Sequence, residues 1–169
     1  MNDIAVITGT THGIGRVASR ELAIAGRTVV MLCRDVAAGN ALRDEIIGQV
    51  PGAAVHVVHC NLASLHSVRH SADIVRRSFG PVDLLINNAG MVSTRHRMSE
   101  DGFELTFATN HLGPFLLTAL LSDHLNGSAR VVGWFSSVMR YAQSGYLYHY
   151  AFAMILGLAS LLLWLIWRP

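Results

Sequence analysis

A glycine-rich turn, TGTTHGIG at residues 8–15, constrains the fold of this chain more than any other feature. An apolar run typical of a buried strand, Ile4–Thr8, leads into it, and an amphipathic stretch at about 14–25 follows it. The pattern changes from strand to helix within a few residues. It therefore predicts a strand, a tight loop and a helix at the start of the chain.

Three glycines in this turn have distinct predicted roles. Gly9 permits the tight turn, Gly13 lets the backbone approach a pyrophosphate, and Gly15 lets the helix pack closely. The free N–H groups at the amino terminus of the helix would face the anion. The turn therefore predicts that a phosphate-bearing ligand binds where the first strand ends.

The following residues alternate short apolar runs with amphipathic stretches, which is the pattern of a parallel sheet with crossover helices. We expect further strands at 28–33, 55–59, 82–86 and 130–135, and helices at 36–50, 64–79 and 103–125. The predicted fold class is α/β: a truncated, doubly wound, Rossmann-like parallel sheet of about five strands, followed by a C-terminal transmembrane helix.

The predicted transmembrane helix lies in a carboxyl-terminal region that carries no acidic residue after Asp123. Residues 146–167 are almost continuously apolar, and as a helix they would rise about 33 Å, close to the ~30 Å hydrocarbon core of a bilayer. Tyrosines at one end and tryptophans at the other resemble the aromatic belts of membrane interfaces. The alternative is a buried core helix.

Composition narrows the possible partners and the compartment. The formal net charge is only +2 and the arginines form no run that would track a phosphate backbone, so we expect no nucleic-acid partner. The two cysteines, Cys33 and Cys60, lie in apolar strand-like runs, and no secretory signal precedes the first strand. This pattern predicts reduced thiols in the cytoplasm.

A second motif, INNAG at residues 86–90, follows the fourth predicted strand. Together with the glycine turn, it resembles the short-chain dehydrogenase/reductase family over about residues 2–137. Three further segments resemble the retinol-dehydrogenase-like branch of that family: CRD at 33–35, CNLASLHSVR at 60–69 and TNHLGPFLLT at 109–118. The resemblance implies an oxidoreductase-type domain that binds a nicotinamide dinucleotide.

The resemblance also implies a set of cofactor-binding residues, namely Gly9, Thr11, Gly13, Ile14, Gly15, Arg34, Asn61, Leu62, Asn87, Ala89 and Gly90. Asn61 stands where the family usually has an aspartate that accepts from the adenine amino group, and its amide oxygen can still accept. NAD-preferring members place an acid where this chain has Cys33. Arg34 beside it suits a 2′-phosphate, so NADP(H) is favoured over NAD(H); a solvated loop charge is the alternative for Arg34.

The resemblance also implies a catalytic group, in which a tyrosine, a serine, a lysine and an asparagine act together. Asn110 matches the asparagine, and Ser137, or else Ser136, matches the serine. The chain has no lysine, because all thirteen of its basic residues are arginine. Tyr150 follows Ser137 at a spacing that some members use, but Met154 stands where the lysine would be. Because Tyr150 also belongs to the apolar tail, we regard the spacing as coincidental. A phenol without a neighbouring ammonium transfers protons poorly at neutral pH.

These observations predict three segments: a dinucleotide-binding domain at 1–137, a junction at 138–145 and a transmembrane helix at 146–167. The tail resembles the last transmembrane helix of the large antiporter-like subunit of respiratory complex I. We expect a membrane-anchored protein with its Rossmann-like domain in the cytoplasm, impaired in hydride transfer. Two alternatives stay open: an active carbonyl reductase or alcohol dehydrogenase on a lipophilic substrate, and a non-catalytic membrane subunit of a respiratory-type complex.

Two further expectations concern partners. The outer edge of the fifth predicted strand would be bare, which invites a protein partner or a second copy of the chain to cover it. His66 and His70 are spaced i, i+4 on a predicted helix, a spacing that can place two imidazoles on one face. No third ligand is evident near them, so we expect no metal site.

Overall fold

The computed structural model describes residues 3–126, in which strands and helices alternate along the chain. Its four strands are β1 (Ile4–Thr8), β2 (Thr28–Cys33), β3 (Val55–His59) and β4 (Leu84–Ile86). They form one parallel sheet in the order β3-β2-β1-β4. The α/β class and the Rossmann-like parallel sheet are therefore confirmed, with four strands in the part of the chain that the structure describes.

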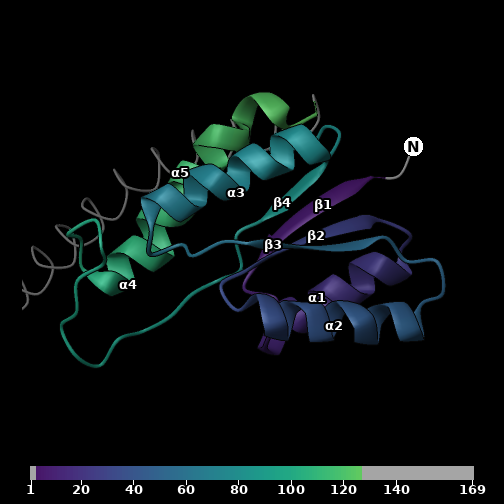
Figure 1. The fold of residues 1–169 in the computed structure, drawn as a ribbon, viewed down its shortest axis with the longest axis horizontal. Helices are drawn as coiled ribbons and strands as arrows, with labels where there is room; N and C mark the ends of the chain where they lie inside the picture. The colour runs from purple at the N-terminus through teal and green to yellow at the C-terminus, as the bar shows by residue number, and fades with distance from the viewer. Residues whose placement is uncertain (1–2, 127–169) are drawn as a thin grey trace, which may run out of the picture. The chain divides into compact units, whose positions relative to one another are not determined.

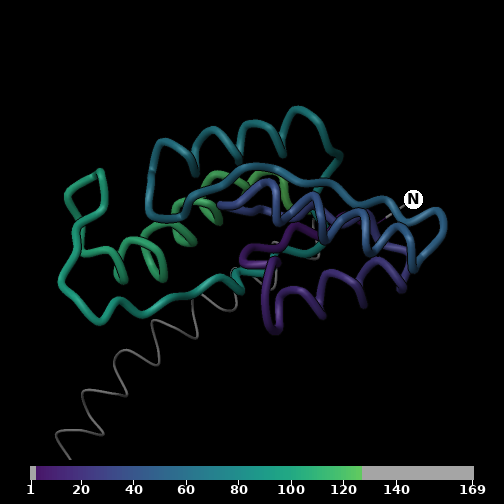
Figure 2. The backbone as a smooth tube through the Cα atoms, turned by 60° about the horizontal axis from the view of Figure 1, so that its bottom comes forward, coloured from purple at the N-terminus to yellow at the C-terminus, as the bar shows by residue number. Residues whose placement is uncertain are grey.

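Helices cover both faces of this sheet (Figure 1). On one face lie α1 (Gly13–Ile24) and α2 (Val36–Gln49), and on the other lie α3 (Leu65–Ser78) and α5 (Gly113–Leu121). The short helix α4 (Leu105–Phe107) precedes α5, beyond the end of the sheet. Figures 1 and 2 both show residues 87–104, between β4 and α4, as a long loop that extends away from the sheet before the chain returns.

Two apolar clusters fill the spaces between the sheet and its helices. The cluster beneath α3 and α5 includes Val6, Val30 and Leu117, and the cluster beneath α1 and α2 includes Ile7 and Met31. Successive side chains of a strand point to opposite faces, so β1 and β2 supply both clusters. Burial on both faces explains why these strands are continuously apolar.

The fourth strand is shorter than predicted, because it begins at Leu84 rather than at Val82. The Asp83 carboxylate accepts a hydrogen bond from the Ile4 backbone N–H at 2.7 Å, at the start of β1. Val82 forms an isolated parallel bridge with Leu125 instead of joining the strand. Its backbone N–H donates to His124 O at 2.9 Å, and its carbonyl accepts from Asn126 N at 3.0 Å.

The helix predicted at 103–125 is interrupted. It begins at Leu105 as α4, widens into a π-helical turn at Ala108–Leu112, continues as α5, and ends in a 3₁₀ turn at Ser122–His124. Pro114, in the first turn of α5, has no N–H to donate to the Asn110 carbonyl four residues earlier. The regular ladder of hydrogen bonds therefore cannot pass through this point, and a wider turn takes its place.

The fifth strand predicted at 130–135, the junction at 138–145 and the transmembrane helix predicted at 146–167 all lie outside the described residues. Within residues 3–126, no helix is both long enough and apolar enough to cross a bilayer.

Replacing two glycines of α2 by alanine should change the stability of the domain in opposite directions. A Cβ atom at Gly39 would lie 2.9 Å from both Cys33 Sγ and Val57 Cγ1, whereas one at Gly48 would meet nothing within 4 Å. We expect Gly39→Ala to destabilise the domain by about 1–3 kcal/mol through overpacking. Gly48→Ala should stabilise the helix by up to about 1 kcal/mol. Thermal unfolding followed by circular dichroism measures both, and a shift in the same direction for both variants would contradict this packing.

Candidate functional site

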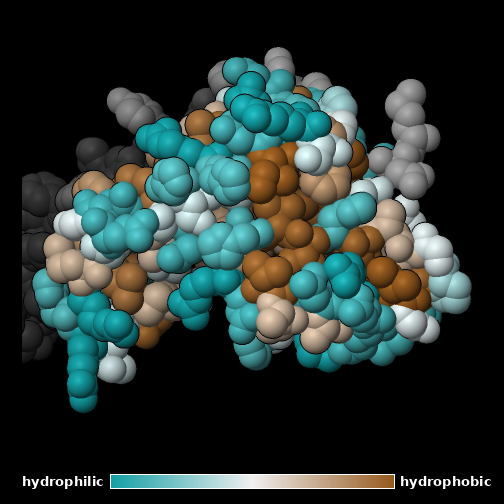
Figure 3. Space-filling view, in the orientation of Figure 1, coloured by the Kyte–Doolittle hydropathy of each residue, from teal (hydrophilic) through white to brown (hydrophobic). Residues whose placement is uncertain are grey.

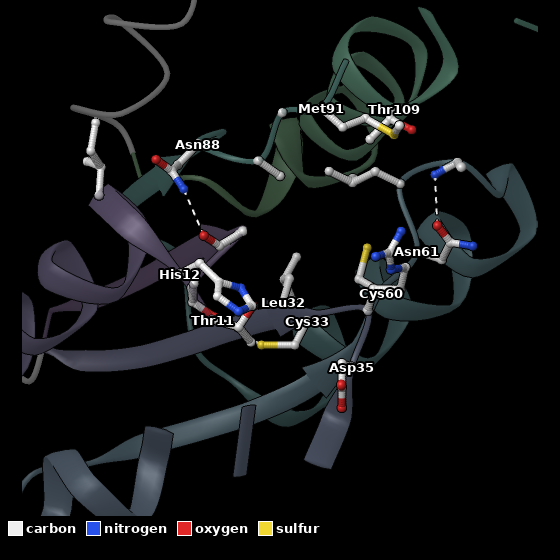
Figure 4. Close-up of a pocket in the computed structure, with 18 of the residues that line it drawn as sticks. Thr11, His12, Leu32, Cys33, Asp35, Cys60, Asn61, Asn88, Met91 and Thr109 are labelled. Carbon is white, nitrogen blue, oxygen red and sulfur yellow. Dashed lines mark hydrogen bonds between the residues drawn. The ribbon is translucent and has the colours of Figure 1, made fainter. Parts of the chain in front are cut away.

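A cavity of about 510 Å³ opens where the strands end. Its walls come from the glycine turn (9–12 and Ile14), the end of β2 (32–35), the end of β3 (60–63), the segment after β4 (88–91), and Leu105 and Thr109. Figure 4 shows side chains from these separate segments facing one space. In parallel α/β sheets, ligands bind at the carboxyl ends of the strands, which is the position of this cavity.

The glycine turn approaches the segment after β4 very closely. Gly9 has a φ of 69°, and a Cβ atom there would lie 2.6 Å from Ala89 Cα. A Cβ atom at Gly15 would lie 2.1 Å from Gly9 O and 2.4 Å from Asn88 Nδ2. Any side chain at either position would therefore push the turn away from the sheet. Gly15 does not line the cavity; its contacts lie behind the turn.

The amino terminus of α1 has no side-chain cap. His12 occupies the N-cap position, and its side chain makes no capping hydrogen bond; its Nδ1 atom lies 2.9 Å from Thr11 Oγ1 instead. Gly13 follows with a φ of 56° and open space around its Cα. Because no side chain accepts from the first N–H groups of α1, these groups can bind an anion in the cavity.

Asn88 holds the turn in place. Its Nδ2 donates to Thr8 O at 3.0 Å and to Gly9 O at 2.9 Å. The dashed line from Asn88 in Figure 4 marks the bond to Gly9. In return, the Thr8 hydroxyl accepts from the backbone N–H groups of Asn88 and Ala89, at 3.1 and 3.0 Å. This reciprocal set of bonds joins the ends of β1 and β4, the two neighbouring strands on either side of the turn.

Asn88 lines the cavity, whereas Asn87 was the asparagine predicted for the site. Asn87 does not line the cavity, and its Nδ2 donates to Thr118 Oγ1 on α5 at 3.0 Å. Neighbouring residues of an extended chain point to opposite sides, so only one asparagine of the INNAG motif can reach the turn. The motif signalled an asparagine here, but the end of β4 had to be known to decide which one.

The end of β2 contributes three side chains to the cavity wall: a thiol, a carboxylate and a guanidinium. The Cys33 thiol lies 3.0 Å from Thr10 Oγ1, and burial raises its pKa, so it is neutral at pH 7. The Asp35 carboxylate accepts from Ala38 N at 3.0 Å and thereby caps α2. Arg34 lies between them in the sequence, is exposed and lines the cavity. Positive charge is therefore available to a ligand at this end of the cavity.

The end of β3 contributes Asn61 to the wall of the cavity. The amide oxygen of Asn61, expected to accept from an adenine, already accepts from Ala63 N at 3.1 Å. The Asn61 backbone N–H donates to Ser67 Oγ at 2.9 Å, so both groups help to shape the turn into α3. Cys60 beside it is buried, and burial raises the pKa of its thiol. This wall of the cavity carries no acid.

Asn110, the predicted catalytic asparagine, lies in the π-helical turn and is bonded to the loop after β4. Its Oδ1 accepts from Met91 N at 2.8 Å and its Nδ2 donates to Met91 O at 2.7 Å. Both side-chain atoms are thus occupied in fixing the backbone beside the cavity. The other predicted catalytic residues, Ser137 with its alternative Ser136, and Tyr150, lie outside the described residues.

No cluster of three or more histidine, cysteine, aspartate or glutamate side chains that could hold a metal ion occurs within residues 3–126. His66 and His70 are both exposed on α3.

Comparison with known proteins agrees with this architecture. A sequence profile of the short chain dehydrogenase family matches residues 3–151, so the chain belongs to that family. The matched range extends past Ser137 and includes Tyr150. It thus enters the tail for which a complex I subunit was the expected relative, and that expectation finds no support in these comparisons.

The chain is similar to retinol dehydrogenase 13 of Homo sapiens, with 43% identity over 124 residues, which cover 73% of this chain and 38% of that protein. It is 38% identical over 146 residues to the chloroplastic short-chain dehydrogenase TIC 32 B of Brassica napus, covering 86% of this chain and 46% of that protein. The chain thus spans less than half the length of these curated relatives. A metagenomic short-chain oxidoreductase in complex with NADP superimposes with a TM-score of 0.64 at 29% identity, over 72% of this chain and 56% of that chain.

The cap of α4 should make stability depend on pH. Glu104 accepts from Thr106 N at 2.9 Å and from Phe107 N at 2.7 Å, and these hydrogen bonds lower the pKa of its carboxyl. A carboxylate with a lowered pKa stabilises the fold above its ordinary pKa and loses that effect as pH falls through the lowered value. The difference in melting temperature between the wild-type chain and Glu104→Gln should therefore be largest at neutral pH and shrink in acid. A difference that does not change with pH would show that the charge plays no part.

Proposed function

We propose that this chain binds NADP(H) in the cavity at the carboxyl ends of the strands, in preference to NAD(H). We further propose that it is attached to a membrane through residues 146–167, with the nucleotide-binding domain in the cytoplasm, and that it is impaired in hydride transfer. The observation that carries the first proposal is the glycine turn pressed against the segment after β4, beside an uncapped helix terminus.

The turn fits a dinucleotide pyrophosphate. Gly9 and Ala89 leave no room for a side chain between them, so the backbone itself forms the floor of the cavity. The open N–H groups of α1 supply donors for phosphate oxygens, and the helix dipole adds positive potential at the same place. Ile14 is exposed and lines the cavity, where it offers an apolar surface beside those donors.

The charges at the end of β2 favour a 2′-phosphate. Among the described residues Arg34 takes part in no ion pair, so its guanidinium is available to a phosphate oxygen. The acid that would repel a phosphate, Asp35, accepts a hydrogen bond from the Ala38 N–H in the first turn of α2, and the nearby thiols are neutral. A guanidinium binds phosphate through several parallel hydrogen bonds, which an uncharged ribose hydroxyl cannot match.

The bound nicotinamide ring would supply hydride chemistry, and the residues of this chain would position it. Asn110 fixes the backbone of Met91, and Met91 and Thr109 line the cavity next to it. The missing part is proton transfer. These 169 residues include no lysine, and an arginine cannot take that place in a proton relay because it never releases its proton near neutral pH. Binding is therefore expected to persist while turnover is low.

Cofactor preference can be tested by isothermal titration of the full chain with NADPH and NADH. Arg34→Gln should weaken NADPH binding roughly 10- to 100-fold, the effect of losing hydrogen bonds to a charged group, and leave NADH binding nearly unchanged. Arg43→Gln is the matched control, because Arg43 lies on α2, is paired with Asp44 and does not line the cavity. Equal affinity for both cofactors would contradict the preference. Failure to bind either would contradict the nucleotide site and favour a non-catalytic membrane subunit.

Hydride transfer can be tested by following NADPH oxidation with a panel of aldehydes and ketones that includes lipophilic ones. We expect no turnover above background from the wild-type chain, because no ammonium lowers the pKa of a catalytic phenol. Met154→Lys restores the family spacing after Tyr150, and we expect no gain because that spacing is coincidental. Efficient turnover by the wild-type chain would identify it as a working reductase, and a gain in the variant would assign proton transfer to Tyr150.

A further inference from the structure

The outer face of α3 carries a set of basic side chains that the nucleotide site does not use. The exposed residues of this face are His66, Arg69, His70, Asp73, Arg76 and Arg77. Their spacing follows the helical period, so all six lie on one side of the helix, opposite the buried Val68, Ala72 and Val75. We call this set the α3 basic face. It contains three arginines against one aspartate.

The arginines of this face have no acidic partners within residues 3–126. The four ion pairs found there join Arg16 to Glu45, Arg20 to Glu21, Arg27 to Asp3 and Arg43 to Asp44. None of them involves α3, so the arginines of α1 and α2 are paired while those of α3 are not. The two helical layers of the fold therefore differ in how their positive charge is balanced.

Besides Asp73 on the face itself, two acids of the loop after β4 contact the amino-terminal end of α3. Asp101 accepts from Leu65 N at 2.8 Å, and Glu100 accepts from the Ser64 hydroxyl. These contacts place the negative charge of the loop at the positive pole of the helix, away from Arg76 and Arg77 in its last turn. Figure 3 shows hydrophilic side chains gathered where Figure 1 places α3. The positive charge of the face is thus open to solvent.

We infer that the α3 basic face docks on a bilayer surface that contains anionic phospholipid. Unpaired arginines on one side of a straight helix match a plane of phosphate and carboxylate headgroups, and each arginine close to such a surface strengthens binding roughly fivefold. The choice of a lipid over a soluble polyanion rests on the proposed membrane attachment through residues 146–167. A tether of that kind holds the face near the headgroups at high effective concentration.

The test uses the full chain reconstituted in nanodiscs of phosphatidylcholine alone or of phosphatidylcholine mixed with phosphatidylserine. Modification of arginines by phenylglyoxal, read by mass spectrometry, should fall several-fold at Arg69, Arg76 and Arg77 when phosphatidylserine is present, and recover at high salt. Arg20 and Arg43 should be modified equally in both. Equal modification of α3 in the two kinds of nanodisc would overturn the inference.

A second measurement separates this inference from the proposed anchor. In flotation with phosphatidylcholine vesicles, an anchored chain floats without any anionic lipid; a chain that stays behind shows that the anchor has failed. In that case binding to phosphatidylserine vesicles still tests the α3 basic face alone.

The triple variant Arg69→Gln/Arg76→Gln/Arg77→Gln should then bind these vesicles on the order of a hundredfold more weakly than the wild type does. The control Arg20→Gln/Arg27→Gln/Arg43→Gln, with the same loss of charge, should bind as the wild type does. Equal loss in both variants, or tighter binding to an oligonucleotide than to the vesicles, would overturn the inference.

Discussion

The close approach of the glycine turn to the segment after β4 is the contact on which the rest of the site depends. Gly9 can lie against Ala89 only because it has no side chain and tolerates a positive φ. Asn88 and Thr8 then exchange hydrogen bonds across the same gap. These bonds fix the start of α1 relative to β4, and the cavity exists because both are held.

Helix capping decides the electrostatic character of that cavity. Asp35 would place a negative charge beside a bound phosphate, but its carboxylate accepts from the first turn of α2. Glu104 does the same for α4, on the other side of the cavity. Capping lets a carboxylate balance the positive end of a helix dipole. Arg34 and the uncapped start of α1 are the positive groups that a ligand meets in the cavity, beside the capping carboxylate of Asp35.

Sequence patterns were most informative where one interaction determines a structure, and least where two compete. The first three strands have their predicted bounds. For β1 and β2 the reason is that apolar runs buried on both faces have no alternative to the interior of a sheet. The predicted start of β4 was wrong because the Asp83 carboxylate binds the first N–H of β1, a contact 79 residues distant in sequence. The choice between Asn87 and Asn88 also depended on contacts distant in sequence, because Asn87 binds Thr118 on α5 and Asn88 binds the glycine turn. The break before α5 was readable in Pro114, which cannot donate to the helix ladder.

Binding and proton transfer depend on different parts of such a site, and this separation explains how a chain can keep one without the other. The donors that we propose for phosphate in the described cavity are backbone N–H groups and one guanidinium, none of which has to change its protonation state. Proton transfer needs a group whose pKa lies near the working pH, which a nearby ammonium normally provides for a phenol. An arginine contributes the charge but not the exchangeable proton. A chain can thus keep the interactions that bind the cofactor and lose those made only in the transition state. Its affinity for the cofactor then persists, and its rate of hydride transfer falls.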